Sequence, residues 1–201
     1  MPAHEHPQST LQVRTHVALL GGINVQGHNK VSMADLRRLV AAMGHQHVAT
    51  YIQSGNVVFD AGDRSADEAA LAHELEMAIA AEFSLRIGVV VVARDHLREV
   101  VRSNPFRQAV DPKTLHAVFF QDAFELERAH STVAAVERAR TKGSRDDARV
   151  VDAALYLWTP GGFARSLLRA ELELGGKASP MRGGTARNWA TVTMLESLLE
   201  E

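Results

Sequence analysis

The sequence predicts an α+β fold made of two subdomains of one type, packed together, with mostly antiparallel sheets. Short apolar runs typical of buried strands alternate along the chain with amphipathic segments of helical period. The predicted order in the first half is strand, helix, two strands joined as a hairpin, helix and strand, which is the ferredoxin-like βαββαβ arrangement. The second half repeats that order. We therefore expect two ferredoxin-like subdomains.

The first predicted strand and helix are the clearest elements. The apolar run 17–20 is short and is followed by two glycines, as a buried strand often is. Ser32 stands where a helix N-cap belongs, and Asp35 three residues later favours the positive helix start. Apolar residues then recur on one helical face as far as Met43, and Gly44 supplies the stop. This segment predicts a strand, a polar loop and a helix.

Three further signals complete the first half. Residues 48–53 and 56–59 are β-rich runs separated by Ser-Gly, which predicts a tight hairpin. Residues 65–68 form an S-x-x-E capping box, which predicts the start of a helix that runs to about residue 83. Residues 87–92 are a nearly continuous apolar run, typical of a strand covered by helices.

The second half carries the same kinds of signal. In its first long helix we expect Val133 and Val136 to point inward, and the strand before the last helix is weak. The last helix has Asn188 as a plausible N-cap. The expected elements are a helix at 95–102, a strand at 115–120, a helix at 126–139, a hairpin at 149–151 and 154–158, a helix at 163–174, a strand at 181–186 and a helix from 188.

These elements divide the chain into four predicted parts. Residues 1–12 read as a flexible leader, because they are polar and lack periodicity. Residues 13–94 form the first subdomain, residues 95–112 the connection and residues 113–201 the second subdomain with its C-terminal helix. Since no low-complexity linker separates the subdomains, we expect them to pack closely.

Composition narrows the classes of function. With 46% hydrophobic residues among 201, the chain can build a real core. A net charge of −2 disfavours nucleic acid as a partner, although a local basic patch keeps that option open. The absence of cysteine removes disulfides, thiol nucleophiles and thiolate metal sites. No apolar run reaches the ~18 residues of a membrane helix, and the start has no secretory signal. We expect a soluble, cytoplasmic protein without a membrane partner.

The loop between the first strand and helix is the first candidate site. Gly22 and Gly27 bracket four residues, as in a phosphate-binding loop, but Lys30 stands two positions later than that motif requires. A nucleotide triphosphatase is therefore disfavoured, and the glycines can serve backbone turns alone. A polar loop that carries Asn24 and Lys30 ahead of a helix N-terminus could still hold an anion.

Two other polar stretches are candidates. Gln53 and Asn56 flank a Ser-Gly pair, which a hairpin turn explains as well as ligand binding does. Between residues 161 and 190 five Arg and Lys side chains accompany two Glu, and Arg forks suit carboxylate or phosphate. A charge-balanced surface explains this stretch equally. Arg187, beside the plausible N-cap Asn188, is its most specific part.

Metal and RNA sites find weaker support. The ten histidines do not fall at ligand spacings, and His73-Glu74 does not continue to the H-E-x-x-H zinc motif. RNA-recognition domains share the topology of the first half but expose aromatic residues on their central strands, whereas the strands here are aliphatic. We therefore predict no metal site and no cofactor.

A family resemblance follows from five phrases of the sequence. They are ALLGGINVQGHNKVSMADL, TYIQSGNVVF, SNPF, GFARSLL and TARNWATV. Together they resemble the bacterial family of unknown function numbered 1697, over about residues 16–199. The resemblance implies two ferredoxin-like subdomains and no established activity. The chain departs from the family's pattern at Gly21, where the family usually has Arg, at Leu167, where it has Lys, and at Ala186, where it often has Thr. An anion bound at these phrases would be held less tightly here, or would be a different one.

The leading hypothesis is a module that binds a small anionic or nucleotide-like ligand in a cleft between the subdomains. Cationic side chains would contact its charge, while amides and a hydroxyl would set its orientation. The predicted ligand-binding residues are Asn24, Lys30, Gln53, Asn56, Arg165, Ser166, Arg187 and Asn188. One alternative is an enzyme that uses the same loops, with His28 as the only natural acid–base group. The other is a structural or self-assembly protein whose sheet edges associate. Oligomeric state is not predicted.

Overall fold

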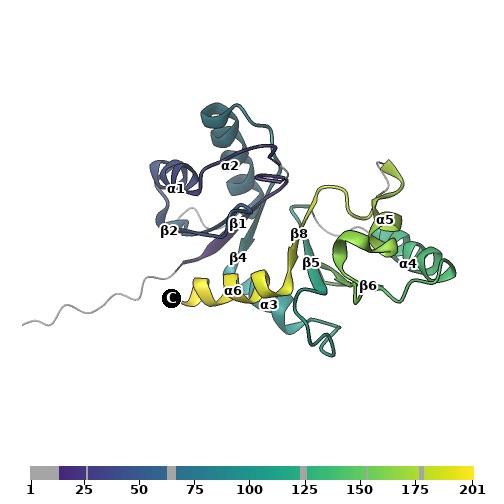
Figure 1. Cartoon of the computed structure of the whole chain (residues 1–201). Coiled ribbons are helices and arrows are strands. Elements are labelled where there is room, and N and C mark those ends of the chain that lie inside the picture. Colours follow the sequence, from purple (N-terminus) through teal and green to yellow (C-terminus); the bar gives the residue numbers. More distant parts are fainter. Residues whose placement is uncertain (1–13, 26, 63–66, 123–125, 153, 177–178) are drawn as a thin grey trace, which may run out of the picture.

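The computed structural model of the chain describes residues 14–25, 27–62, 67–122, 126–152, 154–176 and 179–201. It contains two four-stranded antiparallel sheets, each flanked by helices (Figure 1). The α+β class and the two ferredoxin-like sheets expected from the sequence are thus confirmed. The predicted leader, residues 1–12, lies outside the described residues.

The first half of the fold follows the ferredoxin-like order and adds a helix at its end. The sheet order is β2-β3-β1-β4, with every neighbouring pair antiparallel. Its elements are β1 (His16–Leu20), α1 (Met33–Ala42), β2 (Gln46–Tyr51), β3 (Asn56–Asp60), α2 (Glu68–Phe83), β4 (Val89–Ala93) and α3 (Arg94–Arg102).

The second half repeats the first, helix for helix and strand for strand, apart from one short 3₁₀ turn. Its sheet order, β6-β7-β5-β8, is the same when the strands are counted from the start of the half. Its elements are β5 (Leu115–Phe120), α4 (Leu126–Thr141), β6 (Asp147–Val151), β7 (Ala154–Trp158), η2 (Phe163–Arg165), α5 (Leu167–Glu173), β8 (Gly184–Asn188) and α6 (Trp189–Glu200).

Both faces of each sheet are buried, which explains why the strands read as continuous apolar runs. Successive residues of β1 point to opposite faces. Ala18 and Leu20 enter a core with α1 and α2, whereas Val17 and Leu19 enter a core shared by the two halves. A third core lies between the second sheet and the helices α4 and α5. The shared core therefore joins the halves.

Helices α3 and α6 lie together beside the shared core (Figure 1). Each of them contacts the opposite half. α6 packs against β1 and β3 of the first sheet as well as against its own strands. The buried hydroxyl of Tyr156, on β7, donates a hydrogen bond to the carbonyl of Val100 in α3, at 2.8 Å. The expectation of close packing between the halves agrees with these contacts, while the boundary at residues 95–112 stays a prediction.

Four local predictions are corrected by the structure, and the first two concern α2 and α4. α2 begins at Glu68 with Asp67 as its N-cap, because the Asp67 carboxylate accepts from the amides of Ala69 and Ala70. Ser65, the predicted cap, lies outside the described residues. On α4, Val133 is 63% exposed, since the buried face is formed by Val136 together with small residues on either side of it.

The other two corrections concern the end of the second half. The predicted helix 163–174 is divided at Ser166, whose extended backbone and N-cap hydrogen bond to the Arg169 amide separate η2 from α5. The last strand runs over 184–188 rather than 181–186, because these residues are the ones that pair with β5. The shift places Arg187 within the strand, opposite Ala117.

Candidate functional site

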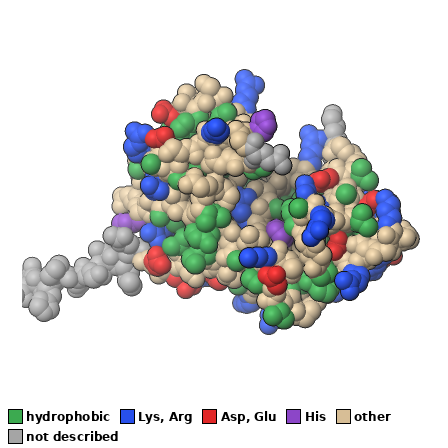
Figure 2. All heavy atoms as spheres, viewed as in Figure 1, with side chains coloured by type: hydrophobic (Ala, Val, Ile, Leu, Met, Phe, Trp, Pro, Cys, Tyr) green, Lys and Arg blue, Asp and Glu red, His purple; other side chains and the backbone are tan. Residues whose placement is uncertain are grey.

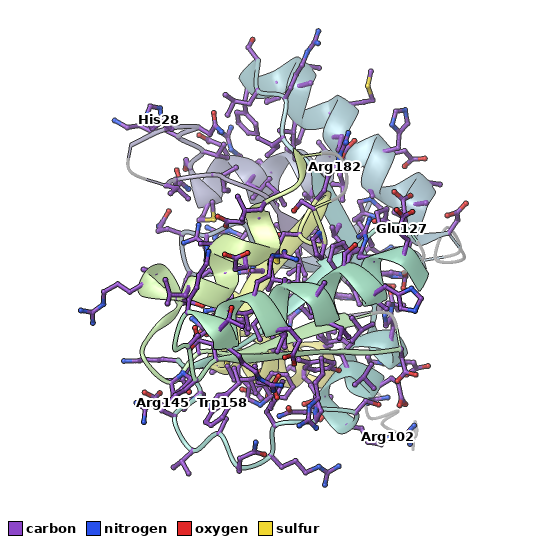
Figure 3. All side chains as sticks on the ribbon, turned by 90° about the vertical axis from the view of Figure 1, so that its right-hand side faces the viewer. His28, Arg102, Glu127, Arg145, Trp158 and Arg182 are labelled. Carbon is purple, nitrogen blue, oxygen red and sulfur yellow. The ribbon has the colours of Figure 1, made fainter. Side chains whose placement is uncertain are left out.

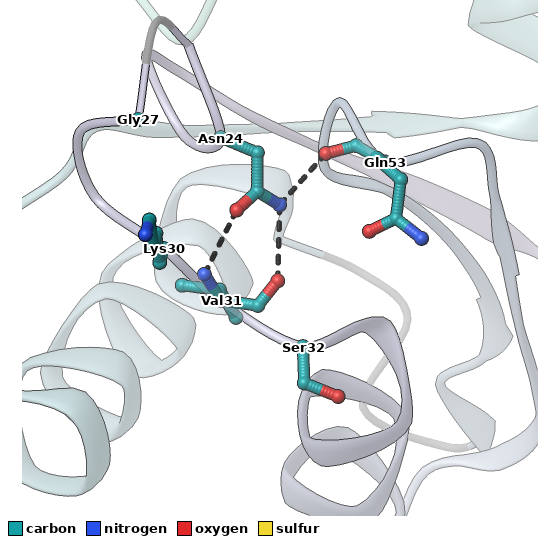
Figure 4. A pocket seen from close by; sticks show the side chains of 6 residues that line it. All are labelled: Asn24, Gly27, Lys30, Val31, Ser32 and Gln53. Carbon is teal, nitrogen blue, oxygen red and sulfur yellow. Dashed lines mark hydrogen bonds between the residues drawn. The ribbon is translucent and has the colours of Figure 1, made fainter.

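The loop between β1 and α1 is held in shape by one asparagine. The Asn24 side chain donates to the carbonyls of Val31 at 2.9 Å and Gln53 at 2.8 Å, and it accepts from the Val31 amide at 3.0 Å (Figure 4). Asn24 has a positive φ of 53°, a conformation that Asn tolerates better than most residues. These bonds fasten the end of the loop to the turn between β2 and β3.

A pocket of about 400 Å³ opens beside this fastening (Figure 4). All of its lining residues come from the first half, from the loop, the start of α1 and the turn after β2. They are Asn24, Gly27, Lys30, Val31, Ser32 and Gln53. The structure thus brings together three of the predicted residues, Asn24, Lys30 and Gln53, in a pocket that belongs to one half.

The electrostatics of the pocket favour negative charge. Lys30 is exposed at its rim, and the lining contains no acidic side chain. The pocket also reaches the N-terminus of α1, where helix amides and the helix dipole present partial positive charge. Asp35 in the first turn of that helix forms an ion pair with Arg38, which offsets its own negative charge. Sequence reasoning identified Ser32 as an N-cap but not as a lining residue, because a cap carries no signal for a pocket.

Arg187 lies elsewhere, in the contact between the halves, and is only 8% exposed. Its Nε donates to Oδ1 of Asn56 at 2.5 Å. Its Nη1 donates to Thr185 at 2.7 Å and to the Ala186 carbonyl at 2.9 Å. Its Nη2 donates to the Leu20 carbonyl at 2.8 Å and also faces the carbonyls of Ser54 and Gly55. Burial lowers the pKa of the guanidinium to about 10.

Asn56 is the partner that receives Arg187 in the first half. It is fully buried at the start of β3. While its carbonyl oxygen accepts from Arg187, its amide nitrogen donates to the Tyr51 carbonyl and to the Ser54 hydroxyl, both at 3.1 Å. Asn56 and Arg187 are therefore bonded to each other, and both are committed to protein partners, while their role in ligand binding stays a prediction.

The remaining predicted residues act at helix starts or face solvent. Ser166 caps α5 and donates to Asp146 at 2.7 Å. Asn188 caps α6 by accepting from the Thr191 amide at 2.9 Å. Arg165 is exposed on η2. None of these three lines the pocket around Lys30.

The described residues offer no metal site and no membrane-spanning helix. In the part of the chain that the structure describes, no group of three or more His, Asp or Glu side chains is arranged to hold a metal ion. Within the same residues, every helix is too short or too polar to cross a membrane.

The surface of the molecule is hollowed between the two halves, where the sequence predicted a cleft (Figure 2).

The fold defines an α+β protein of two ferredoxin-like halves, with a pocket beside the loop that precedes α1 in the first half. The chain belongs to the protein family of unknown function DUF1697, whose model matches residues 13–156. The match ends before the Arg165 and Arg187 phrases. The resemblance seen in the sequence is thus confirmed.

One solved structure extends the comparison to nearly the whole chain. The structure of the conserved bacterial protein SP0830 from Streptococcus pneumoniae is similar with a TM-score of 0.72 and 21% identity, over 93% of this chain and 99% of that chain. At this identity the likeness establishes the fold alone. Curated proteins give no match. Neither the family's description nor the name of SP0830 states an activity.

Proposed function

We propose that this protein binds a small anionic ligand, carrying phosphate or carboxylate, in the loop pocket of its first half. The observation that supports this proposal is the meeting of Lys30 with the N-terminal end of α1 in one pocket without acidic lining. A cation and a helix N-terminus both attract negative charge. The volume of about 400 Å³ suits a metabolite or a nucleotide-sized molecule.

Each lining residue has a proposed role. Lys30 supplies the charge that contacts the ligand. Gln53 offers a side-chain amide that can donate and accept, and the Ser32 hydroxyl can still donate, because as a cap it only accepts. Gly27, with a φ of +82° and open space where a Cβ would be, lets a ligand approach the backbone. Asn24 holds the loop and is occupied.

The test measures melting temperature against a panel of anions. The panel contains pyrophosphate, ADP, a sugar phosphate, citrate and short RNA, with chloride at matched ionic strength. A ligand present at ~100 times its Kd stabilises by about 2.7 kcal/mol, which for a chain of this size is a shift of roughly 5 to 10 °C. We expect such a shift with at least one small anion, and we expect Lys30→Ala to abolish most of it.

Lys113→Ala is the matched control, since Lys113 is also exposed but lies outside the pocket. It makes the same change of net charge. An equal loss of the shift in both variants would indicate general charge attraction, and no shift in the wild type would contradict the proposal. Protection by RNA alone would point to a nucleic-acid partner instead.

The two alternatives read from the sequence gain no specific support from the pocket. Its lining contains no carboxylate and no histidine, and His28 lies at the outer edge of the loop (Figure 3). An enzyme would need such a group for acid–base chemistry. We also propose a cytoplasmic location, with which a chain without cysteine is compatible.

A further inference from the structure

The turn between β2 and β3, residues 52–55, lies between the pocket and the second half. On one side, the carbonyl of Gln53 accepts from Asn24, and Gln53 lines the pocket. On the other side, the carbonyls of Ser54 and Gly55 face Nη2 of Arg187, at 3.2 and 3.4 Å. The same short turn therefore touches the candidate site and a residue of the other half.

Arg187 holds the base of the loop as well as the turn. Its Nη2 also donates to the carbonyl of Leu20, the last residue of β1 before the loop begins. The Leu20 amide in turn donates to the Gly55 carbonyl at 2.8 Å. One guanidinium thus fixes both backbone segments from which the pocket is built.

The chemistry of Arg187 suits fixing rather than ligand contact. A guanidinium has five N–H groups in a rigid fork. Here the hydrogen bonds to Asn56, Thr185 and three or more carbonyls occupy all of them, and each of these acceptors is neutral. A small displacement of the turn would leave some of these N–H groups without acceptors. Such a displacement is unfavourable, because a buried cation is costly unless its hydrogen bonds are complete. The turn is therefore held in one position.

We propose that Arg187 is a positioning residue for the anion pocket, and that occupancy of the pocket in the first half is coupled to its contact with the second half. The proposal rests on the proposed function, because the coupling needs a ligand to be bound. By linkage, the free energy by which the Arg187 contact strengthens ligand binding equals the free energy by which a bound ligand strengthens the contact between the halves.

Arg187→Lys is the decisive variant, because Lys keeps the positive charge but loses the fork that reaches several acceptors at once. Tyr156→Phe is the matched control. It also removes a buried hydrogen bond between the halves, that of the Tyr156 hydroxyl to Val100, and this bond joins β7 to α3 rather than to the loop or the turn. Thr185→Val is a milder second variant, which removes one acceptor of Arg187 and keeps the side chain's shape.

Two quantities are measured at 25 °C, and the melting temperature of each variant is recorded beside them. The first is the Kd for inorganic pyrophosphate, by calorimetry. The second is amide hydrogen exchange without ligand, in peptides that cover residues 20–33 and 51–56. We expect Arg187→Lys to weaken pyrophosphate binding about 10-fold or more and to speed exchange in both peptides. Thr185→Val should weaken binding about 2- to 3-fold. Tyr156→Phe should lower the melting temperature while leaving Kd and exchange as in the wild type.

Wild-type Kd and exchange in Arg187→Lys would overturn the proposal, as would an equal weakening of binding in Tyr156→Phe. If Arg187→Lys does not fold, Thr185→Val against Tyr156→Phe makes the same comparison, and equal Kd values in these two overturn the coupling. Where pyrophosphate does not bind, Kd is measured for the panel anion that gives the largest shift, and absence of binding by the wild type to every small anion of the panel would contradict the proposed function and the coupling together. In that case faster exchange confined to the Arg187 and Thr185 variants would still establish that Arg187 holds the turn.

Discussion

At the scale of single residues, the two cations Arg187 and Lys30 lie in opposite environments. Both carry a positive charge and both stand in polar stretches of the sequence. Lys30 is exposed at a pocket, whereas Arg187 is buried and bonded to acceptors of the other half. Its partner Asn56 is 131 positions away along the chain. Local sequence carries no signal of such a distant partner, so the sequence could identify Arg187 as important but not its role.

His116 carries a prediction about pH at the same scale. Its ring is 9% exposed on β5 and stacks on Phe163, with ring centroids 4.1 Å apart. Burial lowers its pKa from 6.5 to about 4. Between about pH 6.5 and pH 4, His116 is therefore protonated in the unfolded chain but neutral in the folded protein. The free energy of unfolding is unaffected by His116 protonation above that range and decreases as pH falls through it toward 4.

We expect the wild type to lose stability between pH 7 and pH 4.5, and we expect His116→Leu to remove about 2 to 3 kcal/mol of that loss. Urea unfolding at several pH values measures this difference. His28→Leu is the control, since His28 is exposed. Parallel pH profiles for wild type and His116→Leu would mean that the buried ring is not the group responsible.

At the scale of elements, the sequence is most informative where a strand or helix is defined by its own residues. β5 and β7 run over the predicted residues, because each is a continuous apolar run. The predicted last strand, 181–186, differs from β8, because the bounds of β8 depend on its pairing with β5. The predicted helix 163–174 is divided at Ser166, whose side chain caps α5 by accepting from the Arg169 amide and also donates to Asp146, 20 positions away along the chain. Elements defined by distant partners are those that local patterns miss.

The turn that supports the pocket yields a prediction about packing. Gly55 has a φ of +74°, and a Cβ there would stand 2.7 Å from side-chain atoms of Ile23 and Leu20. We expect Gly55→Ala to destabilise the protein by about 2 to 5 kcal/mol, because overpacking adds to left-handed strain. Gly143→Ala, at a φ of +84° with open space around it, should cost only about 1 to 2 kcal/mol. Chemical unfolding of both variants measures the two values, and equal losses would show that the contact with Ile23 is unimportant.

At the scale of the whole molecule, two repeated halves share one core, and the last helix of each half, α3 or α6, contacts the other half. This arrangement follows from the repeated order of elements, which the sequence shows, and from the burial of both sheet faces, which its apolar runs indicate. The place of the candidate site does not follow. A cleft between the halves stays a prediction, whereas the pocket that brings Asn24, Lys30 and Gln53 together lies within the first half, where a loop and a turn converge in space.

The most direct test of the anion pocket is a titration of the ¹⁵N-labelled wild type with pyrophosphate, followed by amide chemical shifts. We expect saturable shifts concentrated in the loop and start of α1, residues 24–34, and in the turn, residues 53–56, and we expect their loss in Lys30→Ala. Saturable shifts centred on Arg165 or on other surface cations, with none at the loop, would contradict the proposal.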